Sequence, residues 1–451
     1  MQRTCRTEQW PLPDMSVARG DVLVPAWVDH PERGRVACPA ARLLGGSLLR
    51  NGLAVRYQDL APPPSPSPSP AMDADGRAVL QVLSYLGRDG AATGLAAVSA
   101  PGPAAAVVTA ALERWAAVMR TRRLVVGGVE PLCAGVRRAR AVVDAVAESG
   151  RPTVVLAPDP VAAGPVIGRG RAVRGTESAM ELERVLDGAV VVVGPAGVAP
   201  ALRARIAAQG RTPVDAGCPL ALAAQAEVRR FAQQGETVML VGRSGHGAVP
   251  ALLGQAAAGS VRLVEDLAQA RQLEVADPGR VAVVLQPGLP LGEAESVAES
   301  VRKRFGHVLP QHPSTYCHAA DDRLRALTQL ARACAVVLVT GPAASARETV
   351  RVIEQAGAAA YAVLGPEGVR PGWLKGRASV GVTAAAGAEP GLVQALVRTL
   401  SGLGPCAVEL QEGATVASTT SDAMSAVAGG TAAVEQDPGR ALVPVRTQPG
   451  A

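Results

Sequence analysis

Aromatic residues make up only 2% of this 451-residue chain, and lysine occurs only as Lys303 and Lys375. Proteins that bind single-stranded nucleic acid interleave basic residues with aromatic side chains on which bases stack. Here the net charge of +6 comes almost entirely from arginines that are scattered along the sequence. We expect these side chains to lie on solvated faces of helices. The composition therefore predicts no nucleic-acid partner, although a basic surface favours encounter with an acidic electron carrier.

Long apolar runs and an export signal are also missing. No run of about 18 apolar residues is free of charged side chains, so no membrane span is expected. The N-terminus, MQRTCRTEQWPLPDM, lacks the apolar segment of a secretory signal, which predicts a cytoplasmic protein. Seven cysteines are an odd number for such a chain, so a disulfide framework is not expected. The cysteines are then buried thiols, metal ligands or a catalytic thiol.

Apolar strands alternate with helices along most of the chain. Continuous Val/Leu runs between helical segments predict an α/β fold whose parallel sheets are covered on both faces. The Pro/Ser-rich stretch PPPSPSPSPA predicts a stiff linker, and the polar, Gly-rich C-terminus predicts disorder. The predicted organisation is an N-terminal α/β extension in two parts (1–61 and 72–120) around the linker (62–71), three similar α/β domains (121–215, 216–313 and 314–411) and a disordered tail (412–451).

Within the extension, local sequence predicts three elements. DVLVPAWV (21–28) predicts a strand, and RLLGGSLLRNG (42–52) predicts a short helix that ends at glycine. PAAAVVTAALERWAAVMRT (103–121) predicts a longer helix. No residue of the extension indicates a particular chemistry.

Three cysteines occupy the same place in an internal repeat. Cys133, Cys218 and Cys317 each open a predicted helix, and each helix is followed by an apolar strand. The segments that precede them are RLVVGG (123–128), TPVDAG (212–217) and HVLPQHPSTY (307–316). The start of a helix favours anions and lowers the pKa of a thiol, and thiolates bind soft metals. Three such domains around a pseudo-threefold axis are predicted to direct three thiolates at one centre.

The repeat by itself leaves three explanations open. An iron–sulfur cluster takes thiolate ligands, and three ligands on a four-iron cluster leave one iron open. Zinc is an alternative, with His246 as a fourth ligand. The third explanation is three unrelated buried thiols, since free cysteine is among the most buried residue types. Cys334 and Cys406 do not follow the repeat.

A family resemblance favours the cluster. The motifs PLCAGVRRA, VDAGCPL, GRSGHG, TYC, VTGPAASA and VGVTAAAGAEP have the order and spacing of the 4-hydroxy-3-methylbut-2-enyl diphosphate reductase, or LytB, family, which the chain resembles over about 122–411. The resemblance implies three α/β domains around a 4Fe–4S cluster held by Cys133, Cys218 and Cys317. It also implies two-electron removal of an allylic hydroxyl in isoprenoid precursor synthesis, with electrons from ferredoxin or flavodoxin.

The substrate residues of the family are largely replaced. The stretch APDPVAAG (157–164) lacks the histidine of the family's first substrate motif. Further replacements are Ala196 for a diphosphate-binding His, Ala248 for the proton-relaying Glu, Pro287 for a Thr and Gly387 for a Ser. The resemblance leaves His246 as the candidate catalytic residue. The candidate substrate-binding residues are Arg243, His246, Gln286, Ser345 and Arg347.

These losses lead to three functional hypotheses. A diphosphate needs many charge-assisted donors, and loss of a general acid lowers rates by about 10²–10⁴-fold. The favoured hypothesis is a 4Fe–4S reductase of this type with an altered small oxygenated or anionic substrate. The alternative is a non-catalytic cluster-binding paralogue that acts as a sensor, electron carrier or partner subunit. The third is the family reaction in an unusual pocket.

Overall fold

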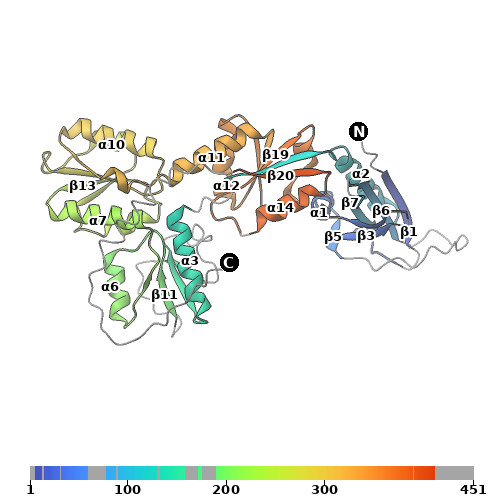
Figure 1. The fold of residues 1–451 in the computed structure, drawn as a ribbon, viewed down its shortest axis with the longest axis horizontal. Coiled ribbons are helices and arrows are strands. Elements are labelled where there is room, and N and C mark those ends of the chain that lie inside the picture. The colour runs from blue at the N-terminus through green and yellow to red at the C-terminus, as the bar shows by residue number, and fades with distance from the viewer. Residues whose placement is uncertain are drawn as a thin grey trace, which may run out of the picture.

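The computed structural model of the chain describes residues 6–12, 15–30, 32–58, 78–87, 90–128, 133–157, 171–174, 189–389 and 391–411. The predicted linker, the predicted tail and residues 158–164 lie outside these ranges. The described residues form four sheets, three of them fully parallel (Figure 1). The α/β fold class predicted from the alternation of strands and helices is confirmed.

The first two parallel sheets have the same strand order. One has the order β10-β9-β11-β12 and the other β14-β13-β15-β16, so the second strand in sequence lies at one edge and the fourth at the other. The strands of the first are β9 (Thr153–Ala157), β10 (Arg171–Arg174), β11 (Val190–Val193) and β12 (Val214–Asp215). Those of the second are β13 (Thr237–Val241), β14 (Val261–Val264), β15 (Val281–Leu285) and β16 (Leu309–Pro310).

The third parallel sheet contains a strand that the sequence analysis assigned to the first domain. Its order is β18-β17-β19-β8-β20, and β8 (Arg122–Val126) pairs with the two strands on either side of it. The others are β17 (Val336–Thr340), β18 (Ala359–Val363), β19 (Ser379–Ala384) and β20 (Cys406–Leu410). The predicted domain start at 121 is therefore wrong for this strand. The strands that pair with β8 begin at Ser379 and Cys406, more than 250 residues later in the sequence, so no local pattern could predict this pairing.

Helices cover these sheets and connect their strands. The first domain has α3 (Ala134–Glu148) and α6 (Pro200–Ala208). The second has α7 (Pro219–Gln233), α8 (Ala248–Leu253), α9 (Leu267–Gln272), α10 (Leu291–Phe305) and the 3₁₀ turn η1 (Pro313–Thr315). The third has α11 (Ala319–Ala333), α12 (Ala343–Gln355), η2 (Pro366–Gly368), α13 (Pro371–Leu374) and α14 (Leu392–Ser401). Among the described residues, no helix is both long and apolar enough to cross a membrane.

The N-terminal extension forms a single mixed sheet from both sides of the predicted linker. Its main path is β1-β6-β7-β2-β5, in which β1 pairs antiparallel with β6. Its strands are β1 (Arg6–Leu12), β2 (Asp21–Val24), β3 (Trp27–His30), β4 (Gly34–Ala37), β5 (Ala54–Tyr57), β6 (Ala78–Leu86) and β7 (Ala92–Ser99). The predicted strand 21–28 is in fact two strands, β2 and β3, with Pro25 between them. Proline has no N–H for a sheet hydrogen bond, so a break there is expected.

Two helices accompany this sheet, and one of them attaches it to the third domain. Helix α1 (Ala41–Arg50) confirms the predicted short helix, whereas α2 (Pro103–Ala116) ends earlier than predicted. One hydrophobic core is shared by the extension and the third domain, and it contains Leu43, Trp115 and Leu396. In Figure 1 the blue N-terminal unit correspondingly lies against the orange third domain, away from the green first domain.

Candidate functional site

Each repeat cysteine lies where the chain crosses from one domain into the next. Strand β12 ends the first sheet before Cys218, and β16 ends the second sheet before Cys317. Strand β8, in the same place in the third sheet, precedes Cys133, from which the chain enters the first domain. The chain therefore passes from the third sheet to the first domain, then to the second, and then back to the third. This closed path explains why three cysteines far apart in sequence lie near one another, between the domains.

Cys133 and Cys218 are the N-caps of α3 and α7, as the sequence predicts. Cys317 differs slightly, because His318 is the N-cap of α11 and the cysteine precedes it. The thiol of Cys317 accepts backbone N–H groups from Ala319 and from Gly288, which lies in the second domain. Cys317 is thus held by two domains.

The three thiols lie close enough to affect one another. A Cβ atom added at Gly135, in the first turn of α3, would lie 2.3 Å from Sγ of Cys218. The pKa of the Cys317 thiol is raised to about 11, chiefly by burial and also by the charges of Cys133 and Cys218, although backbone N–H groups lower it. The first, second and third domains therefore each contribute one thiol to a common centre.

Burial outweighs the helix termini in setting the thiol acidity. The pKa of Cys218 is raised, first by burial and then by Cys133, although the N–H groups of Ala221 and Leu220 and the charge of Arg138 lower it. The N–H groups at the helix starts lower the thiol pKa as predicted, but burial raises the pKa of Cys218 and Cys317 by more. Without a cation the half-buried thiols of Cys218 and Cys317 stay protonated at neutral pH, and a bound metal would have to displace their protons.

The donors at the cysteine centre are of the kind that an iron–sulfur cluster takes. In the described part of the chain, no set of three His, Cys, Asp or Glu side chains gathers closely enough to hold a single metal ion. A multi-iron cluster takes thiolates that approach from different sides, together with N–H donors near its sulfur atoms. Three thiols from three domains, two of them with helix-start N–H groups, fit that donor set.

Gly135 is the residue that allows this approach, and it provides a test. In a helix, Gly→Ala normally stabilises by about 0.5–1 kcal/mol. At Gly135 the new methyl would overlap the Cys218 thiol, so we expect Gly135→Ala to lower the iron content of the purified protein severalfold. Gly292→Ala in α10 meets no atom within 4 Å and is the matched control, with wild-type iron. Equal iron in both variants, measured by colorimetric assay, would contradict the proximity of α3 to Cys218.

His246 lies beside the cysteine centre in a defined tautomer. Its Nδ1 accepts the backbone N–H of Ala248 at 3.2 Å, so the neutral ring carries its proton on Nε2. That nitrogen would lie 3.4 Å from a Cβ built on Gly288, the residue whose N–H contacts Cys317. Burial lowers the pKa of His246, and the charge of Arg243 lowers it further. His246 therefore presents an N–H donor near Cys317.

Arg243 and Gln286 lie together, and Gln286 keeps a buried donor without a partner. The Arg243 guanidinium binds both carboxylate oxygens of Glu293, at 2.7 and 2.8 Å, so its charge is already compensated. The Gln286 Oε1 accepts the Arg243 backbone N–H at 2.8 Å. Its Nε2 is buried and has no hydrogen-bond partner among the described residues. Glu348 of α12 also raises the pKa of Arg243, which places the third domain close to this group.

The two candidates on α12 are less well placed as donors. The Ser345 hydroxyl donates to the Ala386 carbonyl at 2.7 Å, so its single proton is not available to a substrate. Arg347 is exposed and forms no ion pair with any described residue. At the position of a lost histidine, the Ala196 carbonyl accepts the side-chain amide of Gln225 at 3.0 Å, so this turn is held by protein.

Arg323 is a residue of this region that the sequence analysis missed. Its Nη2 donates to the Ala384 carbonyl at 3.0 Å and weakly to Thr349, whereas Nη1 is buried without a partner in the described structure. Burial lowers the pKa of Arg323, and Glu348 opposes this. Arg323 lies on α11, six residues after Cys317. This short distance from a candidate ligand is the sequence signal that could have identified it.

The sequence matches the LytB protein family over residues 126–401. A 4-hydroxy-3-methylbut-2-enyl diphosphate reductase of Bordetella pertussis is 37% identical over 235 residues, which cover 52% of this chain and 72% of the relative. The Burkholderia mallei protein named 4-hydroxy-3-methylbut-2-enyl diphosphate reductase 2 is 34% identical over 284 residues, or 62% and 86% of the two chains. The structure of E-1-hydroxy-2-methyl-but-2-enyl-4-diphosphate reductase from Plasmodium falciparum superposes with a TM-score of 0.53 at 20% identity, covering 66% of this chain and 94% of that one. This superposition shows the fold.

Proposed function

Because the chain belongs to the LytB protein family, we propose that it is an iron–sulfur reductase whose cluster is held by Cys133, Cys218 and Cys317. The observation that carries this proposal is the meeting of the three cysteines at the domain crossovers, with thiols that influence one another. The curated relatives are named diphosphate reductases, which supports reduction as the reaction class. A bound 4Fe–4S cluster would supply electrons and an open iron to a substrate oxygen.

The protein's own residues would orient the substrate and hold one proton. His246 keeps a proton on Nε2 beside Gly288, and the buried Gln286 Nε2 adds a second donor. His246 and Gln286 are neutral donors, and the positive charge of Arg243 is balanced by its ion pair with Glu293. A diphosphate in a dry pocket needs several charge-assisted donors. We therefore propose a small oxygenated substrate of lower charge, with reduced ferredoxin or flavodoxin as electron donor.

One set of contacts favours a second candidate, a cluster-binding paralogue without turnover. Arg243, Ser345 and the turn at Ala196 are all engaged by other parts of the protein. Such a protein would serve as a sensor, electron carrier or partner subunit. The two candidates differ in whether any small oxygenated compound changes the environment of the cluster.

Mössbauer spectroscopy of iron-57-labelled protein, prepared without oxygen, tests the proposal. We expect a four-iron cluster with one distinct iron that 4-hydroxy-3-methylbut-2-enyl diphosphate does not shift, and that an uncharged allylic alcohol does. A shift with the diphosphate would instead favour the family reaction. Indifference to both compounds would favour the paralogue, and the absence of a cluster would refute both candidates.

His246 provides a test of proton donation. We expect His246→Ala to retain the iron of the wild type but to lower substrate-dependent oxidation of reduced methyl viologen by about 10²–10⁴-fold, the usual effect of losing a general acid. His307→Ala, at an exposed position, is the matched control and should keep wild-type activity. Equal rates in both variants would remove His246 from the reaction.

A further inference from the structure

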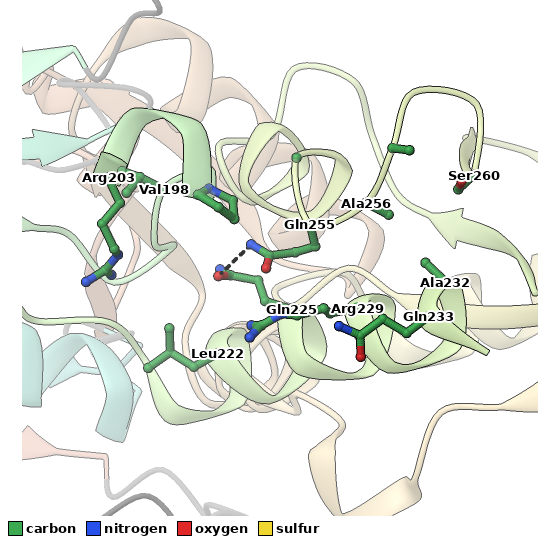
Figure 2. Close-up of a pocket in the computed structure, with 13 residues that line it drawn as sticks. Val198, Arg203, Leu222, Gln225, Arg229, Ala232, Gln233, Gln255, Ala256 and Ser260 are labelled. Carbon is green, nitrogen blue, oxygen red and sulfur yellow. Dashed lines mark hydrogen bonds between the residues drawn. The ribbon is translucent and has the colours of Figure 1, made fainter. Parts of the chain in front are cut away.

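A groove separate from the cysteine centre lies between the first and second domains. It has a volume of about 740 Å³ and is formed by the start of α6, one side of α7 and the segment after α8 (Figure 2). That volume is within the ~300–1,000 Å³ usual for small-molecule sites. The groove follows α7 from Leu222 to Gln233, and no described cysteine lines it. It is therefore distinct from the site proposed above.

The groove carries positive charge. Arg203 of α6 and Arg229 of α7 line it, whereas the lining within the described chain contains no Asp or Glu. Arg203 already contacts Asp215 at 2.7 Å. Arg229 is exposed and, across the described residues, takes part in no ion pair. A guanidinium offers a planar fork of N–H donors that matches carboxylate or phosphate, so this side of the groove favours an anion.

The groove also contains an unused hydrogen-bond acceptor. Gln225, which is 5% exposed, accepts the side-chain N–H of Gln255 at 3.3 Å, as the dashed line in Figure 2 shows. The Gln255 Nε2 also donates to the Ala251 carbonyl at 2.8 Å. These two donations determine the orientation of the amide and leave Oε1 of Gln255 buried, without a donor in the described structure. A buried acceptor without a donor destabilises the folded protein, and a ligand O–H would supply the missing hydrogen bond.

We propose that this groove is a second ligand site, which binds a small hydroxylated anion. The anionic group would contact Arg229, and a hydroxyl would donate to Oε1 of Gln255. Because α6 belongs to the first domain and α7 to the second, the ligand would brace the two domains beside the helix that begins at Cys218. The inference does not depend on what the cysteines bind.

Isothermal titration of the full-length protein with glycerol 3-phosphate, citrate and glycerol tests this site. We expect millimolar or tighter binding of at least one of the two anions and none of glycerol. Arg229→Gln and Gln255→Leu should each weaken that binding about tenfold or more, the usual effect of losing a charge-assisted bond or a buried partner. Arg230→Gln is the matched control, since Arg230 is also exposed on α7 but pairs with Glu227 at 2.6 Å.

Three outcomes would overturn the proposal. These are no binding of either anion, glycerol binding as tight as the anions, or equal weakening by Arg229→Gln and Arg230→Gln, which would indicate general surface charge. The thermal unfolding midpoint and the iron content of Arg229→Gln and Gln255→Leu serve as controls. If both equal those of the wild type, the substitutions have changed the groove and have left the fold and the cysteine centre intact.

Discussion

Replacing Cys218 by serine is expected to remove most of the iron and the visible absorbance of protein purified without oxygen. Cys218 caps α7 and its thiol lies against α3, so its loss removes one of the three proposed ligands from the centre where the domains meet. Serine is a hard oxygen donor and a poor substitute for thiolate on iron–sulfur clusters. Iron and acid-labile sulfide per chain are the quantities to measure.

Cys406→Ser is the control for this variant. Cys406 begins β20 and pairs with Arg122 at the start of the parallel strand β8, whereas Cys133 follows the other end of β8. Burial raises the pKa of Cys406 without any contribution from the other cysteines. It should therefore keep wild-type iron. Equal iron content in the two variants would refute the assignment of the cluster to the repeat cysteines.

Gly46→Ala is expected to separate the extension from the third domain. A Cβ atom at Gly46 in α1 would lie 2.1 Å from the carbonyl oxygen of Glu367, a backbone atom that cannot swing aside. The same contact is reinforced by Arg50, which donates to the carbonyls of Glu367 and Val369 at 2.6 and 3.1 Å. Overpacking of this kind costs about 1–3 kcal/mol. We expect a lower thermal midpoint and faster hydrogen exchange in α1 and the facing part of the third domain.

The neighbouring glycine is the control. A Cβ at Gly45 would meet the hydroxyl end of Tyr57, which is 41% exposed and can rotate away. We therefore expect Gly45→Ala to change the midpoint by less than half as much. If both variants behaved as the wild type, the close approach of α1 to Glu367 would be contradicted.

The local architecture could be predicted from sequence because its signals are local. Continuous Val and Leu runs identify buried parallel strands, and the repeated cysteine, helix and strand identify the three-part design. The structure confirms α3 and α7 directly after their cysteines. The motifs around Cys133, Cys218 and Cys317 likewise indicated the family, which the match over residues 126–401 shows.

The placement of β8 and the state of the candidate substrate residues required the tertiary structure. Strand β8 pairs with β19 and β20, far away in sequence, and so closes the cycle of domain crossings. Arg243 was predicted as an anion-binding residue from its position alone, yet its Nη2 already donates to the carboxylate of Glu293, fifty residues later in the sequence. Burial also outweighs the lowering of the thiol pKa by the helix-start N–H groups.

The sequence by itself thus determined which elements form, where the cysteines lie on them and which family the chain resembles. These properties depend on residue type and spacing within about twenty positions. Only the tertiary structure decided that the extension shares a core with the third domain, that desolvation raises the pKa of Cys218 and Cys317, and that Gln286 retains an unpaired donor. These properties depend on desolvation and on partners from distant segments, which are defined only when the domains are assembled.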